Sequence, residues 1–173
     1  MSGHFPPGPG HWMARWHGRF PHALDVWPAG GVPVEARLRA LRETAEVATR
    51  PLVCIAQGSG AALVVHALPR LGGADVRGVF LVGPPTPEAL EKQGFPAELR
   101  TYPEDAPACP AMVIGSRNDP EAPLARVRQL GESWGVDVLD AGEAGAIDEA
   151  SGHGPWPDGL MVFARFLGGL PET

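Results

Sequence analysis

A short polar turn between two apolar stretches is the first place in this sequence where chemistry could occur. The turn reads Ala56-Gln57-Gly58-Ser59-Gly60 and joins LVCIA (52–56) to GAALVVHAL (60–68). The first stretch predicts a buried strand and the second a helix, and many hydrolases present a nucleophile at such a corner. Ser59 is the only hydroxyl in the turn. The turn therefore raises the question of whether a serine in this protein carries out acyl transfer. That chemistry needs an imidazole base and an orienting carboxylate.

Other residue types that carry chemistry give weaker patterns. Four histidines near the amino terminus are seven, six and five residues apart, which places no two of them on one helical face; they are His4, His11, His17 and His22. No cysteine lies close to them, so we expect no metal site and no cofactor. The sequence GSGA could hold an anion at a helix N-terminus, but any strand-to-helix turn offers the same donors and the long Gly-x-x-x-x-Gly-Lys signature is absent. His66 is interpreted as a residue of the helix that follows the turn.

The elements around this turn alternate between strand and helix patterns. We predict strands at 22–27, 52–56, 76–83, 111–116 and 136–141, and helices at 11–17, 34–48, 60–68, 121–134 and 157–168. Residues 84–107 are predicted to form a loop, and Trp12 and Trp16 to share one face of the first helix. Such alternation predicts an α/β fold with a mainly parallel sheet and helices on both faces. We expect an irregular N-terminal arm at 1–10 and a single domain at 11–173.

Composition restricts the classes of partner and compartment. The chain has 173 residues, 44% of them hydrophobic, and a formal net charge of −6. This charge argues against nucleic acid or an anionic membrane as a partner. There is no apolar run of membrane-spanning length and no signal-peptide core at the start. Cys54 and Cys109 lie in or beside apolar runs, which is typical of packed, reduced thiols, so we expect a cytoplasmic protein.

Several segments resemble, in order and spacing, those of one known family. They are GPGHWMARW (8–16), FLVGPP (80–85), VIGSRNDP (113–120) and GEAGAIDEASGHGPWPDG (142–159), together with the turn at 56–60. The chain resembles the small serine hydrolases of the YdeN type, also called the retinoblastoma-binding-protein-nine family. The resemblance runs along nearly the whole chain. It implies a single-domain, minimal α/β-hydrolase fold and a Ser-His-Asp triad on loops at the carboxyl ends of the strands.

The resemblance also implies that this chain departs from the family at two reactive positions. The nucleophile position of the elbow holds Gly58, and the base position, in Gly145-Ala146-Ile147-Asp148, holds Ala146. Only the acid position is retained, as Asp119. Asp119 has a second interpretation, because NDPEAP is also a good helix start with Asp119 as N-cap and Pro120 in the first turn.

A third departure concerns the front of the chain. Members of the family begin with an apolar strand that lies in the middle of the sheet and ends in a loop contributing to the oxyanion hole. MSGHFPPGPG contains no such strand. Two explanations are compatible with the sequence: the true start lies upstream, or ALDVW (23–27) moves inward to pair with LVCIA.

These departures favour a catalytically impaired hydrolase homologue, a pseudoenzyme with a binding or regulatory role. Its partner would be a small molecule in the old hydrolase pocket or another protein, and the sequence leaves the oligomeric state open. The alternative is an active hydrolase of small acyl esters that uses Ser59 as nucleophile, His153 as displaced base and Asp119 or Asp148 as orienting acid. A decayed gene product with no selected function is a third possibility.

Overall fold

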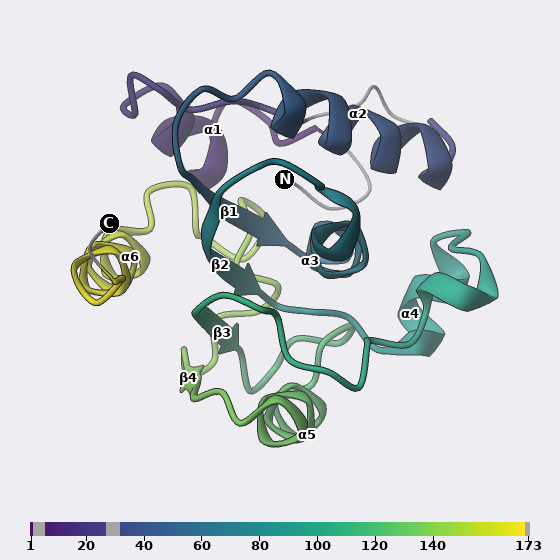
Figure 1. The fold of residues 1–173 in the computed structure, drawn as a ribbon. Coiled ribbons are helices and arrows are strands. Elements are labelled where there is room, and N and C mark those ends of the chain that lie inside the picture. Colours follow the sequence, from purple (N-terminus) through teal and green to yellow (C-terminus); the bar gives the residue numbers. More distant parts are fainter. Residues whose placement is uncertain (2–5, 27–31, 172–173) are drawn as a thin grey trace.

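A four-stranded parallel sheet forms the centre of the molecule (Figure 1). The computed structural model describes residues 1, 6–26 and 32–171. Its strands follow one another in chain order: β1 Leu52–Gln57, β2 Val76–Val82, β3 Ala111–Gly115 and β4 Val138–Asp140. Ala56 pairs with Leu81, which pairs with Val113, which pairs with Val138. The predicted α/β class with a mainly parallel sheet is therefore confirmed.

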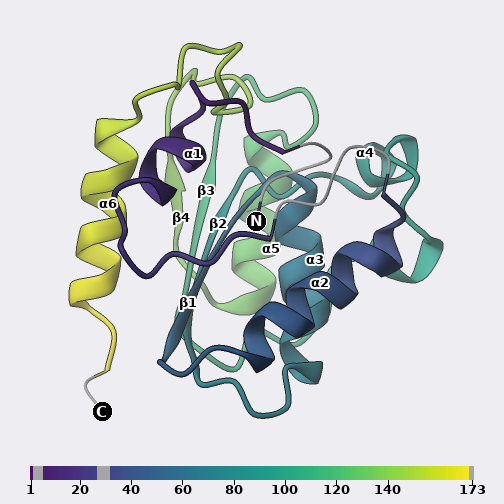
Figure 2. The ribbon, with the colours of Figure 1, turned by 90° about the horizontal axis from the view of Figure 1, so that it is seen from above.

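Helices cover both faces of this sheet (Figures 1 and 2). One face carries α1 Trp12–His17 and α6 Pro157–Gly168. The other face carries α2 Val34–Glu46, α3 Ser59–Ala67 and α5 Leu124–Trp134. Short elements fill the connections: η1 Leu68–Arg70, α4 Pro87–Lys92 and η2 Ala97–Leu99. No helix in the described part of the chain is long and apolar enough to cross a membrane.

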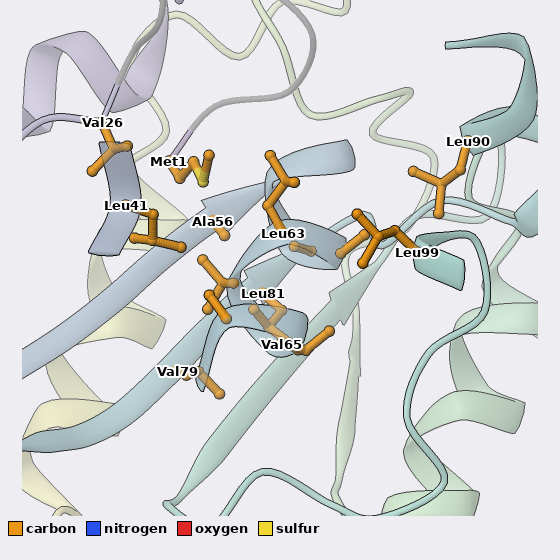
Figure 3. Close-up of a cluster of buried hydrophobic side chains, with 14 of the residues drawn as sticks. Met1, Val26, Leu41, Ala56, Leu63, Val65, Val79, Leu81, Leu90 and Leu99 are labelled. Carbon is orange, nitrogen blue, oxygen red and sulfur yellow. The ribbon is translucent and has the colours of Figure 1, made fainter. Parts of the chain in front are cut away.

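The alternation of side chains along β2 and β3 creates two apolar layers. Phe80 and Ile114 lie in a layer with the aromatic residues of α1 and α6, in which the rings of Trp12 and Trp16 are 4.7 Å apart. The neighbouring Leu81 belongs to the opposite layer, which Figure 3 shows with α3 running through it. Helices cover both faces of these strands, and the strands are therefore apolar at nearly every position.

Three expectations about elements are corrected. Residues 22–26 form no strand and do not pair with β1; the remainder of that predicted strand, Trp27, lies outside the described residues. The predicted loop at 84–107 contains α4, which Thr86 caps by accepting a hydrogen bond from the Ala89 N–H at 3.2 Å. Helix α5 begins at Leu124 rather than residue 121, because Asp119 caps a turn that precedes the helix.

Candidate functional site

Gly58 forms the sharp corner between β1 and α3. Its backbone angles are φ 55° and ψ −135°, a conformation that L-residues adopt only under strain. The Gly58 N–H donates to the carbonyl of Val82 at 2.9 Å, and the Ala61 N–H donates to the carbonyl of Gly58 at 2.9 Å. The corner is therefore anchored to β2 and to the first turn of α3. It places no side chain at its apex.

Ser59 is the first residue of α3 and lies one step beyond the corner. Its side chain is only 1% exposed, and its Oγ has no hydrogen-bond partner among the described residues. Ser59 lines a cavity of about 600 Å³ that is also lined by Gly58 and Ala146. The two positions that the family resemblance assigns to nucleophile and base thus lie in the wall of one cavity, and neither carries a reactive group.

The loop that contains Ala146 is attached to β1 and α1. Gln57 Nε2 donates to the carbonyl of Ala146 at 2.9 Å and to that of Ile147 at 3.0 Å, and Trp12 Nε1 donates to the Ile147 carbonyl at 2.8 Å. Ile147 has a positive φ of 53°, which is strained for a β-branched residue. These bonds hold that strained backbone in place beside the elbow.

The loop after β3 is attached to the same segment. Asn118 Oδ1 accepts from the Gly145 N–H at 2.7 Å, and Ser116 Oγ accepts from the Ala144 N–H at 3.0 Å. Asp119 follows in this loop and is 6% exposed, with Oδ1 accepting from the N–H of Glu121 at 2.9 Å and of Ala122 at 3.1 Å. Desolvation by burial raises the pKa of the Asp119 carboxyl, and these two N–H donors lower it in part.

His153 and Asp148 are connected to each other rather than to Ser59. Asp148 Oδ1 accepts from the N–H and the Oγ of Ser151, at 2.9 and 2.8 Å. His153 Nδ1 lies 3.1 Å from the Ser151 carbonyl oxygen, and its ring is edge-on to Trp156. Asp148 lines the 600 Å³ cavity together with Ser59, whereas His153 is not among its lining residues. The alternative triad is therefore not assembled in this structure.

His11 and Gln57 are residues of the cavity wall that sequence reasoning did not assign to the site. His11 is 8% exposed and caps α1, with Nδ1 accepting from the Met13 N–H at 3.1 Å. Burial lowers the pKa of the His11 imidazole, and the negative charges of Asp148 and Glu149 oppose this shift. The family-like segment GPGHW placed His11 at a helix start, but nothing in the sequence indicated that it would face Gln57.

The remaining histidines form no metal centre in the described part of the chain. No group of three or more His, Cys, Asp or Glu side chains comes close enough to hold an ion there, and His4 lies outside the described residues. His17 Nε2 lies 4.0 Å from Asp25 Oδ2. His66 is half-buried on α3, and this burial lowers the pKa of its imidazole. Cys54 and Cys109 are free thiols.

The cavity offers polar contacts without a nucleophile at the corner. Its wall includes the carboxylates of Glu121, Asp148 and Glu149 and the ammonium of Lys92. The buried Ser59 hydroxyl adds a group that can both donate and accept. Such a wall can orient a small polar molecule through hydrogen bonds.

The parallel sheet, the sharp corner after β1 and the carboxylate after β3 define a protein of the α/β-hydrolase class. A family model described as serine hydrolase matches residues 1–165. The chain therefore belongs to the serine hydrolase family. Among curated proteins, none matches the chain.

Solved structures agree with this assignment. A proposed YdeN-like hydrolase from Pectobacterium atrosepticum is similar with a TM-score of 0.83 and 28% identity, over 95% of this chain and 86% of that one. The ydeN gene product of B. subtilis has a TM-score of 0.74 and 16% identity, over 96% of each chain. A proposed non-haem bromoperoxidase from Mycobacterium tuberculosis has a TM-score of 0.60 and 16% identity, over 97% of this chain and 90% of that one. The last two likenesses show the fold alone.

Proposed function

We propose that this member of the serine hydrolase family is catalytically impaired and binds a small polar molecule in the 600 Å³ cavity beside the elbow. One observation carries the proposal: the residue in the strained corner conformation is Gly58, which has no side chain. An acyl-enzyme needs a nucleophilic atom at the corner and a base to remove its proton. Gly58 cannot supply the first, and Ala146 cannot supply the second.

The tethered loops support a binding role for the cavity. Gln57 and Trp12 donate hydrogen bonds to the Ile147 carbonyl, and the Gly145 N–H donates to Asn118. These bonds fix the backbone around Ala146, although Ala146 itself carries no reactive group. A preformed cavity with a few fixed polar groups is typical of small-molecule sites.

An active esterase that uses Ser59 is the second candidate, and one observation favours it. The Ser59 hydroxyl lies in the cavity wall without a hydrogen-bond partner among the described residues. Its base would be His153 and its acid Asp119 or Asp148. This candidate requires the loop that carries His153 to move, because the imidazole now faces Ser151 and Trp156.

Hydrolysis of short-chain p-nitrophenyl esters separates the two candidates. We expect the purified chain, Ser59→Ala and His153→Ala to hydrolyse these esters at the same rate as buffer, because no side chain at the corner can form an acyl-enzyme. Ser133→Ala, which removes an exposed hydroxyl on α5, is the matched control. Turnover by the unmodified chain that Ser59→Ala abolishes and Ser133→Ala preserves would overturn the proposal.

Ligand binding is tested by a thermal-shift screen of small polar molecules. We expect some of these molecules to raise the midpoint temperature of unfolding of the unmodified chain. They should not raise that of Ala146→Phe, because its larger side chain fills part of the cavity. Compounds that shift both chains equally bind elsewhere. A screen without any compound that distinguishes the two chains would argue against a ligand in this cavity.

We also propose a reducing compartment, in keeping with the expected cytoplasmic location. The free thiols support it, because Cys54 and Cys109 are both half-buried and unpaired. Burial raises the pKa of the Cys54 thiol to about 11, which keeps it protonated and unreactive.

A further inference from the structure

Negative charge predominates in the wall of the 600 Å³ cavity. The carboxylates of Glu121, Asp148 and Glu149 line it together with the ammonium of Lys92. No ion pair among the described residues includes any of these four groups. The carboxylates are thus not neutralised by a cation of the described chain, and the cavity favours a positively charged occupant.

This negative charge also acts on two neighbouring titratable groups. Burial is the main cause that raises the pKa of the Asp119 carboxyl, and the charge of Asp148 raises it further. Burial lowers the pKa of the His11 imidazole, and the charges of Asp148 and Glu149 oppose that shift. In both cases the carboxylates stabilise the more positive form of their neighbour, as they would stabilise a bound cation.

A cluster of carboxylates alone does not make a binding site, but two buried polar atoms of the same wall also lack a partner. The Ser59 hydroxyl and the Gln93 side-chain oxygen Oε1 are both shielded from solvent and make no hydrogen bond to a described residue. Such an atom costs free energy unless a partner reaches it. Because an amide oxygen can only accept, the missing partner of Gln93 Oε1 is a donor.

The orientation of the Gln93 amide is fixed by Glu121. Gln93 Nε2 donates to Glu121 Oε2 at 2.8 Å, so the amide nitrogen faces the carboxylate and Oε1 remains for a ligand. Gln93 directly follows α4, and Glu121 lies in the loop after β3. Both segments follow the carboxyl ends of strands, at the end of the sheet where the loop before α6 also lies (Figure 2). A donor bound to Gln93 Oε1 therefore lies close to the negative charge of Glu121.

The wall offers few free donors to an anion. Gln57 Nε2 donates to the carbonyls of Ala146 and Ile147, and Gln93 Nε2 donates to Glu121. Lys92 has the one ammonium among the side chains that line the cavity in the described structure. A ligand that donates hydrogen bonds thus finds more partners than one that accepts them.

We propose that the ligand of this cavity is a small organic amine, bound as its ammonium ion. The ammonium donates to Gln93 Oε1 and lies against the Glu121 carboxylate, while Asp148 and Glu149 supply the rest of the negative charge. A second polar group of the ligand bonds to the Ser59 hydroxyl, which can donate or accept. This inference rests on the proposed function, because it names the chemical class of the molecule that the cavity binds.

Three molecules of nearly equal size test the sign of the ligand's charge. They are ethanolamine, ethylene glycol and glycolate, which present a cation, a neutral group and an anion beside a hydroxyl. In NMR titrations at constant ionic strength, the backbone amide of Ser59 and the side-chain amide of Gln93 report on binding. We expect ethanolamine to bind about tenfold or more tightly than the other two, the factor that one charge-assisted hydrogen bond contributes.

Two substitutions test the residues that would hold the ammonium. Glu121→Gln removes the negative charge but keeps an oxygen that accepts from Gln93, and it should weaken ethanolamine binding about threefold or more. Gln93→Leu removes the acceptor and should weaken binding at least as much, measured at the Ser59 amide. Glu132→Gln is the matched control, because Glu132 is exposed on α5 and does not line the cavity. It should leave the affinity unchanged.

Several results would overturn this inference. Ethanolamine could fail to bind or bind only away from Ser59 and Gln93, ethylene glycol could bind as tightly, or Glu121→Gln could behave like Glu132→Gln. Tighter binding of glycolate would also overturn it, and would mean that the N-terminus of α3 and Lys92 select an anion.

These results would leave the proposed function standing as long as the thermal-shift screen finds a molecule that distinguishes the unmodified chain from Ala146→Phe. A screen in which no molecule does so would instead count against the proposed function itself. The two failures are therefore distinguishable.

Discussion

Gly58 combines two properties that bear on the chemistry of the site: it has a backbone conformation that would strain any other residue, and it has no side chain. In a hydrolase the strain at such a corner serves to expose the nucleophile. Here the corner conformation is present, and the residue that adopts it carries no side chain. Glycine adopts φ 55° without the steric cost that other residues incur, so the corner is now easier to form than it would be with serine.

The first prediction concerns this backbone. We expect Gly58→Ala to lower the free energy of unfolding by about 1–3 kcal/mol, because alanine must adopt a positive φ. Urea unfolding measures the change. Gly168→Ala is the matched control, since Gly168 lies at the end of α6 with open space around it and no positive φ. Equal stability of Gly58→Ala and the unmodified chain would contradict the corner geometry.

His11 gives the second prediction, which concerns pH. Burial lowers its pKa, so the unfolded chain binds the proton more readily, and the free energy of unfolding falls as the pH drops through the ordinary value of 6.5. Asn keeps a side-chain acceptor for the Met13 N–H but does not titrate. We therefore expect His11→Asn to lose less stability than the unmodified chain between about pH 7.5 and about pH 5.

Urea midpoints of both chains at the two pH values test this prediction. The amino group of Met1 and the imidazole of His66, whose pKa values are also lowered by burial, contribute equally to both chains and cancel in the comparison. Identical pH dependence in the two chains would show that His11 is not desolvated.

At the scale of elements, Gln57 connects the end of β1 to the loop that carries Ala146. Its two hydrogen bonds end on main-chain carbonyls that lie far away in the sequence. We expect Gln57→Leu to destabilise the chain by about 1–3 kcal/mol, because a side chain of similar size leaves buried carbonyls without this donor. Amide exchange at Gly145 and Ile147 should speed up at the same time.

Gln129→Leu is the control for this third prediction, because Gln129 is exposed on α5 and bonds only to the exposed Arg126 in the described structure. It should change stability by no more than about 0.5 kcal/mol. If Gln57→Leu were equally mild and left loop exchange unchanged, Gln57 would not anchor the loop.

The elements also show which features of the fold could be predicted from sequence. The strands β1, β2 and β3 could be predicted from their apolar runs, and the corner after β1 from its glycines. The structure contains these three strands. The segment at 22–26 has the composition of a strand but pairs with no strand among the residues that the structure describes. Helix α4 also has a local signal, since Thr86 and Pro87 form a helix start, although a loop is predicted there.

The site depends on contacts that sequence does not reveal. Gln57 and His11 line one cavity with Asp148 although they lie far from it in the sequence, because the fold brings the three segments together. The hydrogen bonds that Met1 makes with Ile55 and Gln57 involve a single residue of the N-terminal segment, so they correspond to no periodic pattern in the sequence. The reactive positions could be assigned only through the family resemblance. The roles that it assigns to Asp119, Gly58 and Ala146 remain predictions.

At the scale of the whole molecule, the fold of an α/β-hydrolase is present, while the positions that the family resemblance assigns to nucleophile and base hold glycine and alanine. The loops after β1, β3 and β4 converge: the Gly145 N–H donates to Asn118 Oδ1, and Gln57 Nε2 donates to the Ala146 carbonyl. A scaffold of this kind can keep a binding cavity after catalysis is lost, because fold and chemistry are separable. We therefore predict a folded protein that binds a small polar molecule and does not hydrolyse esters.

Reaction with a fluorophosphonate probe, followed by intact-mass measurement, shows whether the chain contains an activated serine. The probe bonds covalently to an activated serine, and Ser59→Ala serves as the control. We predict that the folded, unmodified chain and Ser59→Ala both keep their original mass. A single adduct on the unmodified chain that is absent from Ser59→Ala would contradict it and would establish Ser59 as the nucleophile of an active hydrolase.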